Sequence, residues 1–146
     1  MRDNSFEEKV RRLNWTKYLK PEYCNPEEMD YSPEKLIKVL VQLSQYDGLN
    51  YESVIGIGSE VRFAIGNDHR GTYYPAALEA IDLIIEIEKH SDLEAARNCA
   101  TAILNDLYYF RLELGSNDER LYDSIESIIR KKLQSYSDEA YLALIR

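Results

Sequence analysis

The residue types that could support catalysis or bind a metal are few in this chain, and their spacing suits neither role. The two histidines, His69 and His90, do not lie at a metal-ligand spacing from either cysteine, Cys24 or Cys99. A zinc centre or a cysteine–histidine nucleophile is therefore not expected. Carboxylates are abundant, but they fall on patterned outer faces, where nothing in the sequence indicates the burial that tunes a catalytic acid. We expect no enzyme, no metal and no cofactor.

The stretch "VIGIGSEV" contains a Gly-x-Gly pair at Gly56 and Gly58. A dinucleotide-binding turn needs a third glycine and a preceding strand, but Val61 occupies the third position and no full strand comes before it. Close packing between helices is the favoured interpretation of the pair.

Charge and composition narrow the class of partner. A net charge of -8 and a pI near 4.8 disfavour binding to a phosphate backbone, so no nucleic-acid partner is expected. The acidity indicates either plain solubility or a basic protein partner. No run reaches the roughly 18 apolar residues of a membrane span, and the start "MRDNSFEEKV" lacks the apolar core of a signal peptide. We expect a single domain over residues 1–146, located in the cytoplasm, with no membrane partner.

Apolar residues recur at intervals of three and four, which predicts an all-α fold of about six to seven helices. A first helix follows Ser5, and Ser32 with Pro33 opens a second that runs to about Tyr46. Asn50 is expected to cap a third helix over 51–65, ended by Gly66 in the left-handed conformation.

Three further helices follow. The fourth is expected to begin at Pro75 and run to about residue 90. Two capping boxes, Ser91 with Glu94 and Ser116 with Glu119, predict a fifth helix over about 91–113 and a sixth to about 134. A short last helix should begin near residue 137.

These helices repeat as pairs with a period of about 41 to 46 residues, which is the period of HEAT-type repeats. Leu36, Leu78 and Leu121 fall in step along the first members of the pairs. A pair of this kind cannot bury its apolar face alone, so stacked pairs would form a short α-solenoid with a concave face. The alternative is an unrelated helical bundle whose helices have similar lengths.

The stretch "GNDHRGTYYPAALEAIDLIIEI" resembles a family of small bacterial HEAT-like proteins that have a His-x-Gly-Thr-x-Tyr loop before a helix. His69, Gly71, Thr72, Tyr74 and Ala77 stand at comparable places, and "LNWTKY" is similar to the Trp-containing entry segment of that family. Arg70 departs from the usual Gln. The resemblance covers about residues 13–112 and implies an immunity protein, which holds a toxin domain inactive in the cell that makes it.

Three surfaces are candidates for contact with such a partner. The first is the loop 66–75, where Thr72 could cap the next helix and His69 is expected to hydrogen-bond the turn. The second is a pair of acidic stripes on the fourth and sixth helices, which would share one side of a solenoid. The third is a polar and aromatic side of the fifth helix. The predicted partner-binding residues are Asp68, His69, Tyr73, Tyr74, Glu79, Asp82, Glu86, Asn105, Tyr109, Glu119, Asp123 and Glu126.

The favoured hypothesis is an immunity protein that covers the active surface of a basic nuclease-type toxin domain, as a monomer or in a 1:1 heterodimer. The alternatives are a general HEAT-like scaffold joining two proteins and a helical enzyme whose site is not recognisable. A solvated acidic surface without a partner remains the plain explanation of the stripes.

Overall fold

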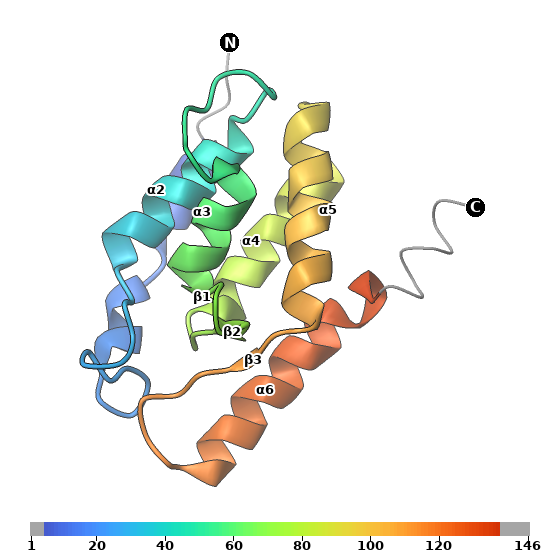
Figure 1. Cartoon of the computed structure of the whole chain (residues 1–146). Helices are drawn as coiled ribbons and strands as arrows, with labels where there is room; N and C mark the ends of the chain where they lie inside the picture. Colours follow the sequence, from blue (N-terminus) through green and yellow to red (C-terminus); the bar gives the residue numbers. More distant parts are fainter. Residues whose placement is uncertain (1–4, 138–146) are drawn as a thin grey trace.

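The computed structural model describes residues 5–137, and within that range the protein is helical except for short connections and a very small sheet (Figure 1). Its elements, in chain order, are α1 (Ser5–Arg12), the 3-10 helix η1 (Trp15–Leu19), α2 (Pro33–Ser44), α3 (Gly56–Ile65), β1 (Gly66–Asn67), β2 (Thr72–Tyr73), α4 (Ala77–His90), α5 (Glu94–Tyr108), β3 (Arg111–Leu112), α6 (Glu119–Leu133) and η2 (Gln134–Tyr136). The predicted all-α fold of about six helices is confirmed. The predicted last helix, after residue 137, lies outside the described residues.

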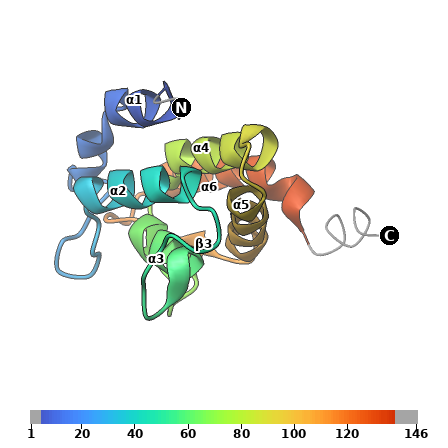
Figure 2. The ribbon, with the colours of Figure 1, turned by 90° about the horizontal axis from the view of Figure 1, so that it is seen from above.

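The helices pack as two adjacent hairpins. Helix α2 packs on α3 and α4 packs on α5, while α2 also contacts α4 and α3 contacts α5. Helix α6 extends the first layer by packing on α4 and α5. Seen from above, α2, α4 and α6 form one layer, α3 and α5 form the other, and α1 covers α2 (Figure 2). The expected pairing of helices into stacked hairpins therefore describes α2 to α5, with α6 as the first helix of the next pair.

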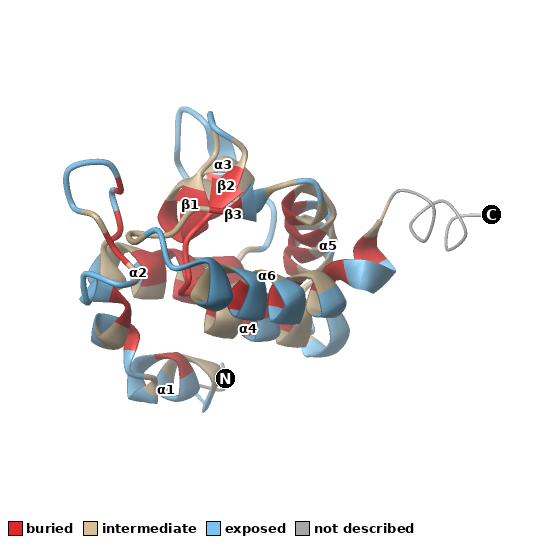
Figure 3. Ribbon diagram, turned by 90° about the horizontal axis from the view of Figure 1, so that it is seen from below, coloured by how far each residue is buried: buried red, intermediate tan, exposed pale blue. Residues whose placement is uncertain are grey.

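Apolar spacing explains which faces are buried. In α4 the buried positions include Ala77, Ala80, Ile81 and Ile84, which fall on one face at helical spacing. The buried residues of the hairpins and of η1 form one continuous core, whereas the outer face of α6 is exposed (Figure 3). Within residues 5–137 no helix is long and apolar enough to cross a membrane.

Of the five helix N-caps predicted within the described residues, at Ser32, Asn50, Thr72, Ser91 and Ser116, the one at Ser32 is present. Ser32 caps α2 by accepting a hydrogen bond from the Lys35 amide at 3.2 Å. The predicted capping box at Ser116 is wrong, because its hydroxyl donates to the Glu22 carbonyl and Asp118 caps α6 instead. The box at Ser91 is also wrong, since Ser91 accepts from the Leu93 amide one turn before the helix.

The loop at 66–75 forms strands that the helical periodicity does not predict. Strands β1 and β2 pair antiparallel, and β2 pairs parallel with β3, which follows α5. Gly66 is not a left-handed cap: its φ is -168°, and it is needed because a Cβ there would lie 2.0 Å from the Thr72 carbonyl oxygen. Thr72 does not cap α4 but lies in β2 and donates to Glu113 at 2.8 Å. The helix then begins at Ala77, two residues after Pro75.

Helix α3 begins at Gly56 rather than at the predicted residue 51. Residues 47–55 form an irregular connection, in which Gly48 has a φ of 96°, and Gly56 at the start of α3 has a φ of 87°. The Asp47 carboxylate accepts hydrogen bonds from the amides of Leu49 and Asn50, which closes a tight turn. The Asn50 side-chain oxygen accepts from the Asp47 amide at 3.1 Å instead of capping a helix.

Candidate protein-binding surfaces

The acidic stripe of α4 is neutralised by lysines of the same chain. Glu79 accepts from Lys17 of η1 at 3.3 Å. Asp82 pairs with Lys132 of α6 at 2.8 Å, and Glu86 pairs with Lys9 of α1 at 3.0 Å. The Lys132 amino group also donates to the Leu78 carbonyl at 2.6 Å, which fixes its position over α4.

These pairs change the expected role of the stripe. A cation on a partner would have to displace a lysine that is already present, so the pairs weaken the attraction that an acidic stripe would otherwise provide. Glu79 is also close to the buried Tyr18, whose pKa is raised by burial first and then by the charge of Glu79. The carboxylates of α4 therefore hold α1, η1 and α6 to one helix, and their contact with a partner stays a prediction.

Tyr73 and Tyr74 are core residues, and their predicted place on a partner-binding surface is wrong. Tyr73 lies in β2, which pairs with β1 on one side and with β3 on the other, and Tyr74 directly follows it. The Tyr74 hydroxyl accepts from the Asp30 amide at 3.2 Å, and its ring packs edge-on against Tyr31. Burial raises the pKa of Tyr73 and of Tyr74. These tyrosines anchor the loop and the connector before α2.

Asp68 and His69, at the tip of the same loop, also make contacts within the chain. Asp68 accepts from the Arg62 guanidinium at 2.8 Å. The His69 side chain packs edge-on against Phe63 with ring centroids 5.0 Å apart. It makes no hydrogen bond to the turn among the described residues, so the expected hydrogen-bonding role is replaced by ring packing.

The polar side of α5 is used in part by the fold. The Asn105 amide donates to the Tyr136 carbonyl at 2.9 Å, which joins α5 to η2. Tyr109 is exposed, and its ring packs edge-on against Tyr108. The Arg130 guanidinium lies over the Tyr108 ring and donates to the carbonyls of Tyr108 and Phe110. Tyr109, which directly follows α5, is therefore exposed to a partner, whereas the Asn105 side chain of α5 makes a contact within the fold.

The stripe on α6 differs from that on α4, because no lysine or arginine of the described chain pairs with Glu119 or Asp123. Both are exposed. Glu126 is half-buried and lies beside Tyr122, whose pKa is raised by burial and then by the hydrogen bond to Glu126. Arg130, at the far end of the stripe, is turned toward backbone carbonyls. Two of the three predicted carboxylates therefore remain open to a partner.

The fold brings a second acidic segment beside the start of α6. The Gly115 amide donates to the Tyr23 carbonyl at 2.9 Å, and a Cβ at Gly115 would lie 2.5 Å from the Cys24 backbone, so the two chain segments touch. The connector 20–31 and residues 115–123 meet at this end of the molecule, below α2 in Figure 1. We call it the acidic end, and its exposed charged residues are Glu22, Glu27, Glu28, Asp30, Asp118, Glu119 and Asp123 with the cations Lys20 and Arg120.

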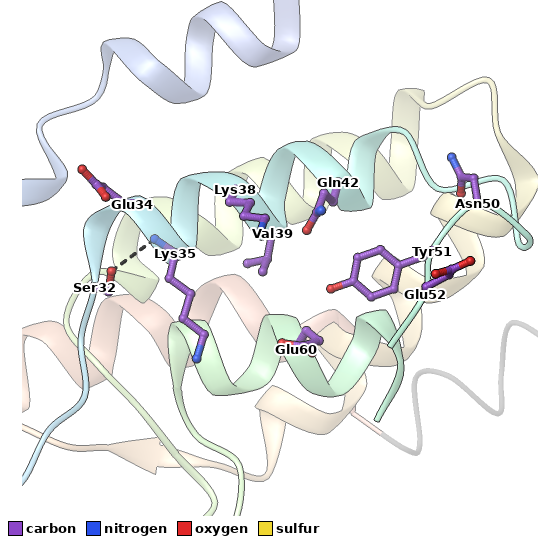
Figure 4. A pocket seen from close by; sticks show the side chains of 10 residues that line it. All are labelled: Ser32, Glu34, Lys35, Lys38, Val39, Gln42, Asn50, Tyr51, Glu52 and Glu60. Atoms are coloured by element: carbon purple, nitrogen blue, oxygen red, sulfur yellow. Dashed lines mark hydrogen bonds between the residues drawn. The ribbon is translucent and has the colours of Figure 1, made fainter. Parts of the chain in front are cut away.

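A further surface is absent from the sequence predictions. The connection 47–55 exposes Leu49, Val54 and Ile55, and open grooves lie on both of its sides. The larger, about 660 Å³, runs between α2 and α3 (Figure 4). The smaller, about 330 Å³, is lined by Asp47 and the start of α5. The missed signal was the stretch "DGLNYESVIG", where two glycines flank apolar residues that follow no helical period.

Comparison of the chain with protein-family models, with curated proteins and with solved structures gave no match. The likeness to the HEAT-like immunity family thus depends on the residues quoted for it. Two of those, Thr72 and Tyr74, are buried in the sheet region, where they support the loop. Within residues 5–137 no group of three or more His, Cys, Asp or Glu side chains is arranged to hold a metal ion.

Proposed function

We propose that the protein is an immunity protein that binds a basic toxin domain, of the nuclease type, through its acidic end. The observation that carries the proposal is the gathering of Glu22, Glu27, Glu28, Glu119 and Asp123 from two segments that lie far apart in the sequence. The stacked hairpins supply the rigid support. The resemblance of residues 66–87 to small HEAT-like immunity proteins is the reason for proposing a toxin domain as the partner.

The contrast between α4 and α6 supports this choice of surface. On α4 each acidic residue of the stripe has a lysine within 3.3 Å, whereas Glu119 and Asp123 have no basic partner among the described residues. Exposed charges of one sign speed association with a partner of opposite sign and set its orientation. Inhibition then requires only that the complex cover the active surface of the toxin, in a 1:1 heterodimer and without a cofactor.

The experiment is co-expression with each toxin-like domain encoded beside the gene, scored by rescue of growth and followed by affinity measurement. Replacing Glu119 and Asp123 by lysine should abolish rescue and raise Kd by about tenfold or more, because like charges then face each other. The matched control replaces Asp82 and Glu86 by lysine. It changes the net charge equally but acts on residues already paired within the chain, so Kd should stay within about threefold.

The outcomes separate the possible surfaces. Loss of rescue in the control alone would assign the interface to α4, and unchanged rescue in both variants would reject electrostatic recognition at either helix.

Wild-type affinity should fall as NaCl is raised from 50 to 500 mM, since screening shortens the range of exposed charges to a few Å. The circular dichroism spectrum of the Glu119 and Asp123 variant should match the wild type, because both side chains are exposed. The control variant breaks the pairs of Asp82 with Lys132 and of Glu86 with Lys9, so a thermal melt must show that it is folded at the assay temperature before its Kd is compared.

A general scaffold that joins two proteins is the second candidate. The observation that favours it is the presence of a second exposed surface, the connection 47–55, at a different end of the molecule from the acidic end (Figure 1). A scaffold would bind two proteins at once, and no neighbouring toxin domain would be neutralised in the growth assay.

A further inference from the structure

The connection 47–55 holds large apolar side chains in water. The side chain of Leu49 is 93 % exposed, Val54 is fully exposed and Ile55 is half exposed. Single exposed apolar residues are ordinary, but three within seven residues on one loop form a patch of the kind found at the centre of protein interfaces. We call residues 47–55 the apolar loop.

Internal hydrogen bonds hold the apolar loop in shape. The Asp47 carboxylate accepts from the Leu49 amide at 2.8 Å, and the Asn50 amide group donates to the Gln45 carbonyl at 2.8 Å. At the other end, Ser53 accepts from the amides of Ile55 and Gly56 and donates to Glu60 at 3.0 Å. A loop ordered before binding loses less conformational entropy when it docks.

Carboxylates surround the apolar loop on both sides. Asp47 and Glu94 line the smaller groove, and Glu52 and Glu60 line the larger one. Figure 4 shows Glu52 and Tyr51 at the loop end of the larger groove, with Lys35 at its opposite end. The surface near the loop is therefore apolar at its tip and acidic at its margin.

We propose that the apolar loop docks into a hollow on a second protein, where Leu49 and Val54 fill an apolar floor and lysines or arginines at the rim face Asp47, Glu52 and Glu94. The charge distribution selects this occupant. Two copies of the chain would bring acidic margins together, and an anionic membrane surface would repel them. The proposal does not depend on the proposed function, because the loop and the acidic end lie on different parts of the molecule.

The test uses the full chain as bait against a displayed library of folded protein fragments from the source genome. We expect retained fragments that carry a basic rim around an apolar hollow. Replacing Leu49 and Val54 by serine should weaken their binding by about a hundredfold, since both side chains would leave an apolar site. The variant should keep its fold, because neither side chain has packing to lose.

Matched controls decide between the loop and other surfaces. Ile128→Ser removes an exposed apolar side chain of α6 and should leave binding unchanged. Glu52→Lys should weaken it, whereas Glu119→Lys with Asp123→Lys should not. A library that yields no fragment dependent on Leu49 and Val54 overturns the proposal. So does loop-dependent dimerisation in sedimentation velocity, or loop-dependent binding to vesicles of phosphatidylcholine and phosphatidylglycerol.

Discussion

Arg62 joins three parts of the fold, and its removal should be among the most costly single changes outside the apolar core. Its guanidinium donates to Asp68 in the loop after β1 at 2.8 Å, to Asp106 of α5 at 3.0 Å and to Ser59 of its own helix at 2.9 Å. The side chain is only 17 % exposed. It thereby fixes the loop 66–75 and the second hairpin relative to α3.

The expected cost can be worked out from the burial of each partner. A hydrogen bond to a charged group contributes about 1.5–3 kcal/mol when buried. The side chain of Asp68 is 22 % exposed and that of Asp106 is 47 % exposed, so water weakens the second interaction more than the first. We expect Arg62→Met to lower the free energy of unfolding by about 2–3 kcal/mol, which corresponds to a fall in Tm of about 8–12 °C for a domain of this size.

Urea denaturation and thermal melts followed by circular dichroism measure this change. Arg11→Met is the matched control, because Arg11 is 57 % exposed and pairs with Glu7 one turn away, an arrangement that contributes about 0.5 kcal/mol or less. In 0.5 M NaCl most of the Arg62 effect should persist and the Arg11 effect should vanish. A double-mutant cycle with Asp68→Asn should return a larger coupling energy than one with Asp106→Asn. If Arg62→Met costs no more than Arg11→Met, the three contacts do not hold the fold together.

Other consequences can be measured on the same protein. Gly66→Ala should cost about 3 kcal/mol or more, because its Cβ would lie 2.0 Å from the backbone oxygen of Thr72. Gly58→Ala should instead gain up to about 1 kcal/mol in urea melts, because it lies within α3 and its Cβ would meet its nearest neighbour, Arg62 Nη1, at an ordinary contact distance of 3.4 Å. Ionisation of Tyr136 should lower the stability above about pH 10. Burial, and then the hydrogen bond to Glu88, raise the pKa of Tyr136 in the folded protein. The folded state therefore keeps a proton that the unfolded chain releases, and the free energy of unfolding falls as the pH rises. Tm measured from pH 8 to 11.5 should begin to decline near pH 9, where the thiols of Cys24 and Cys99 ionise only in the unfolded chain, and should fall more steeply above pH 10, with tyrosinate absorbance appearing as the protein unfolds; a level Tm throughout would contradict this. Burial also raises the pKa of the Cys24 thiol, so at pH 8 its reaction with a disulfide reagent should be about tenfold slower, or more, in the native protein than in urea; equal rates would show that the site opens freely.

The helices and their pairing could be predicted from the sequence because both depend on local spacing. Apolar residues at intervals of three and four predicted α2, α4 and α6, and the cap at Ser32 predicted the start of α2 to the residue. The period of the pairs predicted that α2 and α4 would be neighbours, as they are. Cap positions predicted from neighbouring residues were wrong where the side chain hydrogen-bonds a distant part of the chain instead. Ser116 could have capped α6 but instead bonds to the Glu22 carbonyl, which lies 94 residues earlier in the chain.

The candidate surfaces were harder to predict, since exposure depends on contacts between distant segments. The carboxylates of α4 and α6 have the same spacing along their helices, and nothing local distinguishes Asp82 from Asp123. Lys132 distinguishes them, because the packing of α6 on α4 brings its amino group to within 2.8 Å of Asp82. In the same way Tyr74 and Tyr109 are equally aromatic, yet one is covered and the other open. Five of the twelve predicted residues are exposed, namely His69, Asp82, Tyr109, Glu119 and Asp123, and of these Asp82 is already paired with a lysine of the chain.

Among the described residues, charges without an ion-pair partner and apolar side chains in water lie at places away from α4, which is a reason to expect a binding surface there rather than on α4. A chain that satisfies its own charges and buries its own apolar groups has little left to offer a partner. Around α4 both conditions hold, since three lysines meet three carboxylates and the inner face is buried. At the acidic end Glu119 and Asp123 form no ion pair within residues 5–137, and on the apolar loop hydrogen bonds hold Leu49 and Val54 out in water. Both features are unfavourable or neutral for the isolated protein, and each would become favourable against a complementary surface.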